Sequence, residues 1–291
     1  MGQRHLLTLL SDFGLSDTYV GVMKGVIARV NPAITVVDLT HQIPPQNVAL
    51  ARFALMTAYP YFPTGTVHVA VVDPDVGGDR RAIALAIGQT ATDPAGFLVG
   101  PDNGLFSGIL ADHPLIRAVE LTNSAYWRTA EPSPTFHGRD IFAPVGAHLA
   151  TGAPIEALGT GIDPATLVML NLPPCRQESA GFPSLGADRP TAPHHSRFTG
   201  SIQAIDHFGN LITNIPGRQV SDRPWLLAVK DVVLSGQRTY SESAVGALLA
   251  LIGSHGWIEI AVNCGNAQAR LKLELGDRVV VETETTHVET T

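Results

Sequence analysis

Short apolar runs alternate with stretches of helical spacing over the first part of the chain. His5–Leu10 is an apolar run, after which apolar residues recur at helical spacing from Val20 to Val30 and stop at Asn31-Pro32. The same order then repeats, with a strand at Ile34–Asp38, a helix at Asn47–Tyr59 and a strand at Val67–Val72. On this helix Leu50, Phe53 and Ala54 are expected to face inward. Apolar strands that alternate with helices are typical of a mostly parallel sheet covered on both faces.

The pattern continues to residue 172 and predicts an N-terminal α/β/α domain. Three more strands and a helix are expected at Ala82–Ile87, Phe97–Gly100, Ile116–Leu121 and Asp140–Leu149. Residues 173–196 are rich in Pro, Gly, Ser and Ala without periodicity, which predicts a linker that is disordered.

Residues 197–291 carry a different pattern, in which apolar runs are separated by Gly and Asp turns. Strands are expected at Phe198–Ile205, Trp225–Val229, Trp257–Val262 and Arg278–Glu282, with one short helix at Ser243–Leu251. The sequence therefore predicts the α/β class, with a second, smaller domain that is β-rich and barrel-like.

The composition and charge indicate which kind of molecule the protein binds. The chain has 291 residues, 45% hydrophobic and 15% charged, which is typical of a compact folded protein. Its formal net charge is -7, and Lys24, Lys230 and Lys272 supply its ammonium groups. Because nucleic-acid binding needs a basic surface, we expect a small-molecule substrate and no nucleic acid.

The cysteine content and the targeting signals bear on the cellular location of the protein. Cys175 and Cys264 form no CxxC pair, which excludes a disulfide scaffold and a thiolate zinc site. The chain begins without a signal-peptide pattern, and no apolar run approaches the roughly 18 residues of a membrane span. We therefore expect a cytoplasmic protein without membrane partners.

Polar side chains cluster just after the predicted strands, where ligands bind in open α/β sheets. Asp12 follows the first strand, and the loop Asp73–Arg81 follows the third. Pro101-Asp102-Asn103-Gly104 follows a later strand, and Phe136–Asp140 forms a fourth polar loop. The edge of the sheet that holds these loops is the candidate site.

Each of these residues has a structural interpretation beside the functional one. Asp12 fits an Asx turn or a carboxylate that accepts two ribose hydroxyls, while Asp17 fits the N-cap of the following helix. The Asp73–Arg81 loop holds three carboxylates and two guanidinium groups, more than a turn needs. Arginine beside a carboxylate keeps it ionised and can fix a bound water. A lone histidine such as His137 is more often a surface or core-satisfied imidazole than a catalyst, and its place before the helix opened by Asp140 favours catalysis only modestly.

A metal centre is the competing interpretation of these side chains. Carboxylates and an imidazole suit divalent ions, and five candidates are Asp12, Asp73, Asp75, His137 and Asp140. Nothing in their spacing fixes such a site, because the chain has no HExxH, EF-hand or Walker pattern. A GxSxG elbow is also missing, which disfavours an acyl-serine hydrolase.

Seven motifs in order carry a resemblance to a known family: Leu10-Ser11-Asp12-Phe13-Gly14, Ile43-Pro44-Pro45-Gln46, Val72-Asp73-Pro74-Asp75-Val76-Gly77, Gly100-Pro101-Asp102-Asn103-Gly104, Thr135-Phe136-His137-Gly138-Arg139-Asp140, Ile205-Asp206-His207-Phe208-Gly209-Asn210 and Gly253-Ser254-His255-Gly256. Together they resemble the S-adenosylmethionine hydroxide adenosyltransferase family, which is related to the fluorinases and chlorinases. The similarity extends from about residue 6 to about residue 285 and fails in the linker.

The resemblance implies a function and a catalytic group. Family hydrolases split S-adenosyl-L-methionine with water into adenosine and L-methionine, and the positions that match their water-holding set are Asp73, Arg80 and His137. The halogenase relatives replace the Asp73 loop with a Tyr- and Thr-rich one, whereas this chain keeps the hydrolase version. Asp75 and Gly78-Asp79 depart from the residues that are usual in that loop.

The resemblance also implies substrate contacts and an assembly. Asp12 would hold the ribose hydroxyls, and Asn210 with the backbone near Val262 would bind the adenine edge. By the same matching, the methionine end would contact Asp17, Asp206 and Ser254, and Glu259 would also line this pocket. His255 stands where the halogenases carry Arg beside the methionine carboxylate. The implied assembly is a homotrimer that binds substrate between domains of neighbouring subunits.

Water attack at the ribose C5′ requires no metal or organic cofactor, because the sulfonium already makes methionine a good leaving group. Two alternatives stay open at this point. A halogenase-like reaction is disfavoured because the charge of Asp73 repels a halide. A non-catalytic sensor would bind adenosine or S-adenosylmethionine without turnover.

Overall fold

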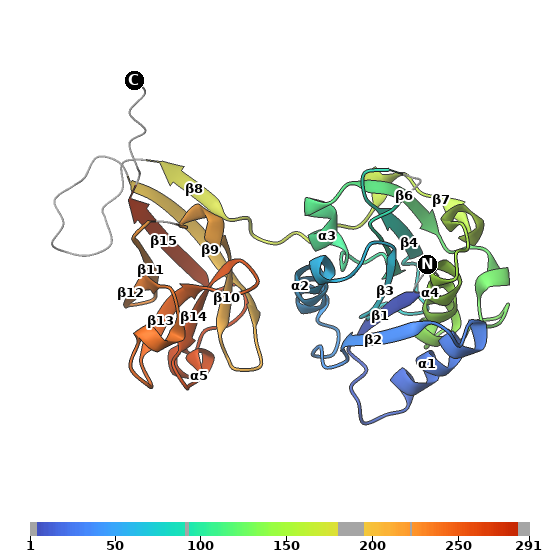
Figure 1. Cartoon of the computed structure of the whole chain (residues 1–291), viewed down its shortest axis with the longest axis horizontal. Coiled ribbons are helices and arrows are strands. Elements are labelled where there is room, and N and C mark those ends of the chain that lie inside the picture. Colours follow the sequence, from blue (N-terminus) through green and yellow to red (C-terminus); the bar gives the residue numbers. More distant parts are fainter. Residues whose placement is uncertain (1–4, 91–92, 180–194, 222, 285–291) are drawn as a thin grey trace, which may run out of the picture. The chain divides into compact units, whose positions relative to one another are not determined.

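The computed structural model describes residues 5–90, 93–179, 195–221 and 223–284, and it separates into two compact units. Unit 1 is Met1–Leu170 and unit 2 is Asn171–Thr291. Figure 1 labels the helices and strands of both units. The greater part of the predicted linker, residues 180–194, lies outside the described residues.

Unit 1 is built on a seven-stranded sheet with the order β2-β1-β3-β5-β4-β6-β7 among its described residues. Its strands are β1 Leu6–Ser11, β2 Thr35–Thr40, β3 Thr66–Val71, β4 Ala82–Ile87, β5 Gly96–Pro101, β6 Leu115–Glu120 and β7 Thr160–Gly161. The first four strands in this order pair in parallel, and β4, β6 and β7 continue the sheet antiparallel. The predicted parallel-rich α/β class is confirmed.

Helices cover both faces of this sheet, as Figure 1 shows. The helices are α1 Tyr19–Val30, α2 Val48–Ala58, α3 Ser107–Asp112 and α4 Ala143–Ala150. Met23 of α1 and Val145 of α4 pack with Val67 and Val69 of β3 on one face. Leu55 of α2 and its neighbours pack with the other face. Strand residues alternate between the two cores because successive side chains point to opposite faces.

Two details of unit 1 differ from the sequence pattern. The helix expected at Asp140–Leu149 begins as a π-helix at Gly138–Phe142 and becomes α-helical only at α4. On α2, Phe53 is buried as expected, whereas Leu50 and Ala54 are half-buried against the core and Ala51 and Leu55 are the more buried residues.

Unit 2 is a closed β-barrel. Its strands are β8 Arg176–Ser179, β9 His195–Ile205, β10 Leu211–Pro216, β11 Trp225–Val229, β12 Val232–Gln237, β13 Leu248–Ile252, β14 Trp257–Val262 and β15 Arg278–Glu284. The order β10-β14-β13-β12-β11-β15-β9 closes on itself because β10 also pairs with β9, while β8 pairs with β9 outside the ring. Closure removes exposed strand edges.

The helix predicted at Ser243–Leu251 is wrong. This segment contains β13, which pairs antiparallel with β14, and Gly246 before it adopts a φ of 81°. A short apolar run such as Leu248–Leu251 carries too little periodicity to separate a buried strand from a helix. The short helix of unit 2 is α5, Ala267–Leu271, whose N-cap Asn266 accepts a hydrogen bond from Ala269 N. The predicted linker likewise contains β8 and the start of β9.

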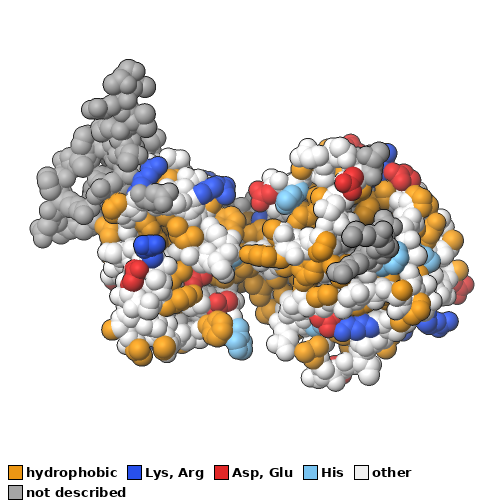
Figure 2. Space-filling model, viewed as in Figure 1, with side chains coloured by type: hydrophobic (Ala, Val, Ile, Leu, Met, Phe, Trp, Pro, Cys, Tyr) orange, Lys and Arg blue, Asp and Glu red, His pale blue; other side chains and the backbone are white. Residues whose placement is uncertain are grey.

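Charged side chains are dispersed on the face drawn in Figure 2, where described Lys and Arg residues stand among acidic and apolar ones without forming a stripe. No helix in the described part of the chain is both long enough and apolar enough to cross a bilayer.

Candidate active site

The loops that follow β1, β3 and β5 lie at one edge of the sheet of unit 1. These three strands are parallel neighbours, so their carboxyl ends point the same way. Asp12 follows β1 directly, Asp73 follows β3, and Asp102 follows β5. The fold therefore brings polar side chains from three separate segments of the sequence to the same edge.

Asp73 and Arg80 form a buried, two-pronged ion pair within the loop between β3 and β4. Arg80 Nε donates to Asp73 Oδ1 at 2.8 Å, and Arg80 Nη2 donates to Asp73 Oδ2. The two side chains are only 5% and 7% exposed, and the guanidinium carbon lies 5.3 Å from the centre of the Phe142 ring. A guanidinium held on both sides in this way has a fixed plane.

His137 joins this pair from a different part of the chain. Its Nδ1 lies 2.7 Å from Arg80 Nη2. Because a guanidinium only donates, Nδ1 is the acceptor, and the neutral ring carries its proton on Nε2. The pKa of His137 is lowered, mainly by burial and next by the positive charge of Arg80. The negative charges of Asp73 and Asp140 act in the opposite direction but do not outweigh these two effects. The ring is therefore neutral near pH 7 and presents an N–H at its other edge.

The two loops that carry these side chains fit together through Gly77. It has a φ of 79°, and a Cβ at this position would lie 2.2 Å from the carbonyl oxygen of Pro134. Only glycine permits both this backbone conformation and so close an approach. The loop that bears Asp73 and Arg80 thus lies directly against the segment that leads to His137.

The other two predicted residues of unit 1 lie at the same edge but outside this cluster. Asp12 is half-buried, and its Oδ2 accepts a hydrogen bond from Gln46 N at 2.7 Å. Asp17 is exposed. The prediction that it is the N-cap of α1 is wrong. The N-cap is Thr18, which has helical backbone angles and makes no side-chain cap bond, so the helix begins one residue later.

The geometry disfavours the metal interpretation. No group of three or more His, Cys, Asp or Glu side chains within the described residues is arranged to hold a metal ion. Asp73 is paired with Arg80, and Asp140 with Arg128 and Arg139. Carboxylates neutralised by arginine are poor partners for a further cation.

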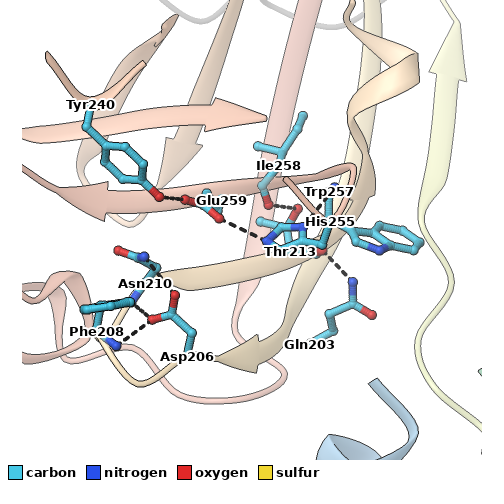
Figure 3. A network of polar contacts seen from close by, with 10 residues as sticks. All are labelled: Gln203, Asp206, Phe208, Asn210, Thr213, Tyr240, His255, Trp257, Ile258 and Glu259. Carbon is cyan, nitrogen blue, oxygen red and sulfur yellow. Dashed lines mark hydrogen bonds and ion pairs between the residues drawn. The ribbon is translucent and has the colours of Figure 1, made fainter. Parts of the chain in front are cut away.

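In unit 2, Asp206 organises the turn that leads into β10, as Figure 3 shows. Its Oδ1 accepts from Phe208 N at 2.9 Å and from Asn210 N at 2.8 Å, and its Oδ2 accepts from Asn210 Nδ2 at 2.9 Å. Asn210 is buried, whereas Phe208 is 70% exposed. The structure thus brings two predicted residues together beside an aromatic face open to solvent.

Glu259 of β14 links two loops of the barrel (Figure 3). It is 3% exposed, accepts a hydrogen bond from the Tyr240 hydroxyl, and lies with Oε2 3.0 Å from His255 Nε2. Trp257 N donates to His255 Nδ1 at 3.1 Å, which places the ring proton on Nε2, facing Glu259. His255 therefore points its N–H at a buried carboxylate.

Ser254 and Val262 complete the predicted set. Ser254 is exposed in the turn between β13 and β14, and Val262 is buried at the end of β14. Tyr240 is not among the residues predicted from the sequence, and its pKa is raised by burial and by its hydrogen bond to Glu259. No local signal could have found it, because the two residues belong to separate segments 19 positions apart.

Comparison with known proteins adds evidence independent of this geometry. The model of the SAM hydroxide adenosyltransferase N-terminal domain matches residues 7–159, and that of the C-terminal domain of the same family matches residues 200–280.

The similarity to named relatives extends over almost the whole chain. An (R)-S-adenosyl-L-methionine hydrolase from Salinispora tropica is 41% identical over 276 residues, which cover 94% of this chain and 97% of the relative. One from Thermus thermophilus is 40% identical over 92% of this chain and 95% of its own. A fluorinase from an Actinoplanes species is 29% identical over 95% and 97% of the two chains.

A solved structure supports the fold. That of an uncharacterised conserved protein from Thermotoga maritima matches with a TM-score of 0.80 and 32% identity, covering 94% of this chain and 99% of the other.

Proposed function

The chain belongs to the SAM hydroxide adenosyltransferase family and is an enzyme that hydrolyses S-adenosyl-L-methionine, and we propose that Asp73, Arg80 and His137 hold the attacking water. The observation that carries this proposal is the contact between the three side chains at the ligand-binding edge of the sheet. A fixed guanidinium and a neutral imidazole N–H are suited to orienting one water molecule.

The proposed step is an in-line displacement at the ribose C5′. The water oxygen forms a bond to C5′ while the bond from C5′ to the sulfonium breaks, and its electron pair returns to sulfur to give the thioether of L-methionine. The new 5′ oxygen then loses one proton, which leaves adenosine. No metal or organic cofactor takes part in this proposal, since the positive sulfur already makes a good leaving group.

The protonation states support a positioning role for His137. Because Nδ1 accepts from Arg80, the ring has only its Nε2–H to offer, so it donates a hydrogen bond and does not remove a proton. The oxygen is strongly acidic once it is bonded to C5′, and the Asp73 carboxylate or solvent then suffices as acceptor. Alignment of the reactants can contribute on the order of 7–11 kcal/mol, whereas a general base typically accelerates a reaction about 10²–10⁴-fold, which is roughly 3–5 kcal/mol.

The substrate contacts are part of the same proposal. Asp12 accepts the ribose hydroxyls, and Asn210 with the backbone near Val262 binds the adenine edge. The residues proposed for the methionine end of the substrate are Asp17, Asp206, Ser254 and Glu259. A ribose diol needs acceptors and an ammonium needs a carboxylate, which supports the division. The exposed Phe208 ring, beside Asp206 and Asn210, supports adenine binding at that turn.

We further propose a homotrimer with its sites at subunit interfaces, an arrangement that rests on the family resemblance. Light scattering coupled to size-exclusion chromatography measures the assembly directly. A cytoplasmic location stays a prediction from the sequence.

The function is tested by incubating the purified protein with S-adenosyl-L-methionine and separating the products by chromatography. Adenosine and methionine should form in equal amounts, and an Asp73→Ala variant should lose both. In water enriched in oxygen-18, the label should enter adenosine. Label in methionine would refute attack at C5′, and binding of substrate without products would identify a sensor.

A further inference from the structure

A second buried charge cluster lies next to His137 and has no part in the proposed water-holding set. Its centre is Asp140, whose side chain is 0% exposed. Arg128 Nε donates to Asp140 Oδ1, and Arg139 reaches both carboxylate oxygens at 2.7 Å. Burial acts to raise the pKa of Asp140, but hydrogen bonds from Arg139, Arg128 and Ser133 N outweigh it and bring the pKa well below its usual range.

Asp140 also fixes the backbone on both sides of His137. Its Oδ2 accepts from Ser133 N at 2.9 Å, its carbonyl oxygen accepts from Arg128 N at 2.9 Å, and its own N–H donates to Phe136 O at 3.2 Å. These bonds close residues 128–140 into a loop around one carboxylate. His137 lies inside this loop, so its position depends on the closure.

Local packing transmits this closure to the imidazole. His137 precedes the π-helix Gly138–Phe142, which contains Asp140. The guanidinium of Arg139 lies 5.1 Å from the centre of the Phe136 ring, and that ring packs edge-on against Phe13 at 5.7 Å. A Cβ on Gly138 would lie 3.3 Å from both phenylalanine rings. The residues on either side of His137 therefore have little room to move.

We propose that Asp140 is a positioning residue for the hydrolysis, which holds His137 at the distance and orientation at which Nδ1 accepts from Arg80. The inference rests on the proposed roles of Arg80 and His137. It differs from a purely stabilising role, because a carboxylate that only stabilises the fold would change the melting temperature on replacement without changing kcat or the pH dependence of kcat/KM.

The charge of Asp140 gives the proposal a distinctive signature. The charged groups that act on the His137 ring are Arg80 and Asp73 from the β3–β4 loop and Asp140 from its own segment, where Arg139 and Arg128 pair with Asp140. Asp140 opposes the lowering of the His137 pKa. Loss of its charge leaves two arginines unneutralised nearby, which lowers that pKa further.

The test is the Asp140→Asn variant of the full chain, assayed for kcat, KM and the pH dependence of kcat/KM. We expect kcat to fall about 10- to 100-fold with KM changed less than about threefold, because a displacement of 1 Å can reduce a rate by 10². The acid limb of the profile should move to lower pH. The matched control is Glu282→Gln, which removes another buried, arginine-paired carboxylate in the barrel and should leave kcat and the acid limb unchanged.

Wild-type kcat and an unmoved acid limb in Asp140→Asn would overturn the inference, whatever happens to the melting temperature. If Asp140→Asn does not fold, Arg139→Gln provides the same test, because it removes two hydrogen bonds to Asp140 and leaves those from Arg128 and Ser133. A kcat reduced about fivefold or more would support the inference, and an unchanged kcat would overturn it. Failure of the proposed function is distinguishable, because the wild-type enzyme would then release no adenosine.

Discussion

Arg80 and His137 are 57 positions apart in the chain, and the contact of 2.7 Å between Arg80 Nη2 and His137 Nδ1 fixes the hydrogen-bonding roles of both side chains. The same guanidinium nitrogen donates to Asp73, so one group determines the orientation of a carboxylate and of an imidazole. Replacements that keep the charge of Arg80 but not its shape should therefore impair the whole cluster.

Arg80→Lys tests this shape requirement. An ammonium is a compact donor that cannot satisfy both oxygens of Asp73 and His137 Nδ1 in one plane. We expect kcat/KM for S-adenosyl-L-methionine to fall by about 10²-fold or more, the scale observed when a preorganised donor is removed. Arg81→Lys is the control, since Arg81 pairs with Asp102 and Thr166 instead. Equal losses in both variants would contradict the role given to Arg80.

The pH dependence of activity should reflect the neutral state of His137. Its pKa is lowered below 6.5, so the neutral form is populated above that lowered value and is lost as the pH falls through it. Protonation would put a hydrogen on Nδ1, facing the Arg80 guanidinium. The acid limb of kcat/KM should therefore lie below pH 6.5, and a limb above this value would count against the assignment.

Acid stability should depend on His68, which is buried in β3 beside Thr8. Burial lowers its folded-state pKa to about 4 from 6.5, so the unfolded chain binds more protons between these values. Stability from this group is present above pH 6.5 and is lost as the pH falls toward 4, by about 3 kcal/mol in all. Chemical unfolding across this range should show a smaller pH slope for His68→Gln, whereas His207→Gln, at an exposed position, should keep the wild-type slope.

Gly77→Ala should show whether the close approach of the Asp73 loop to Pro134 matters for activity, apart from the strain of a positive φ. Alanine at a φ of 79° is strained by about 1–2 kcal/mol, and its Cβ would also meet Pro134 O at 2.2 Å. Gly65→Ala carries similar strain at a φ of 81° with no atom within 4 Å. We expect activity to fall at least about tenfold only in Gly77→Ala, because the Asp73 loop must move away from the His137 segment. Similar activities in the two variants would show that the fit is unimportant.

Glu259→Gln should disturb the barrel network. A glutamine cannot accept from both Tyr240 and His255, since one of its two positions becomes a donor. We expect a loss of about 1–3 kcal/mol in unfolding free energy and a rise in KM larger than any fall in kcat. Tyr240→Phe, which removes one of the two partners, should show a smaller effect in both measurements. A larger effect in Tyr240→Phe would place the important contact elsewhere.

Much of the architecture follows from local pattern. The strands Ala82–Ile87, Trp225–Val229 and Trp257–Val262 occur with the predicted bounds, because runs of apolar residues bounded by turn residues are buried as strands. Helix α1 ends at Val30, before Asn31-Pro32, as expected from residues that stop helices. The motifs likewise sufficed to identify the family to which the chain belongs.

The sequence by itself determined the class of the fold, the family and the types of side chain at the candidate site, since these follow from periodicity and from residue identity. Only the tertiary structure decided that Arg80 contacts His137, that Asp140 pairs with Arg128 and Arg139, and that Leu248–Ile252 is a strand. The physical reason is that such contacts join distant segments, and their free energy depends on how strand order, burial and loop closure bring charges within hydrogen-bonding distance.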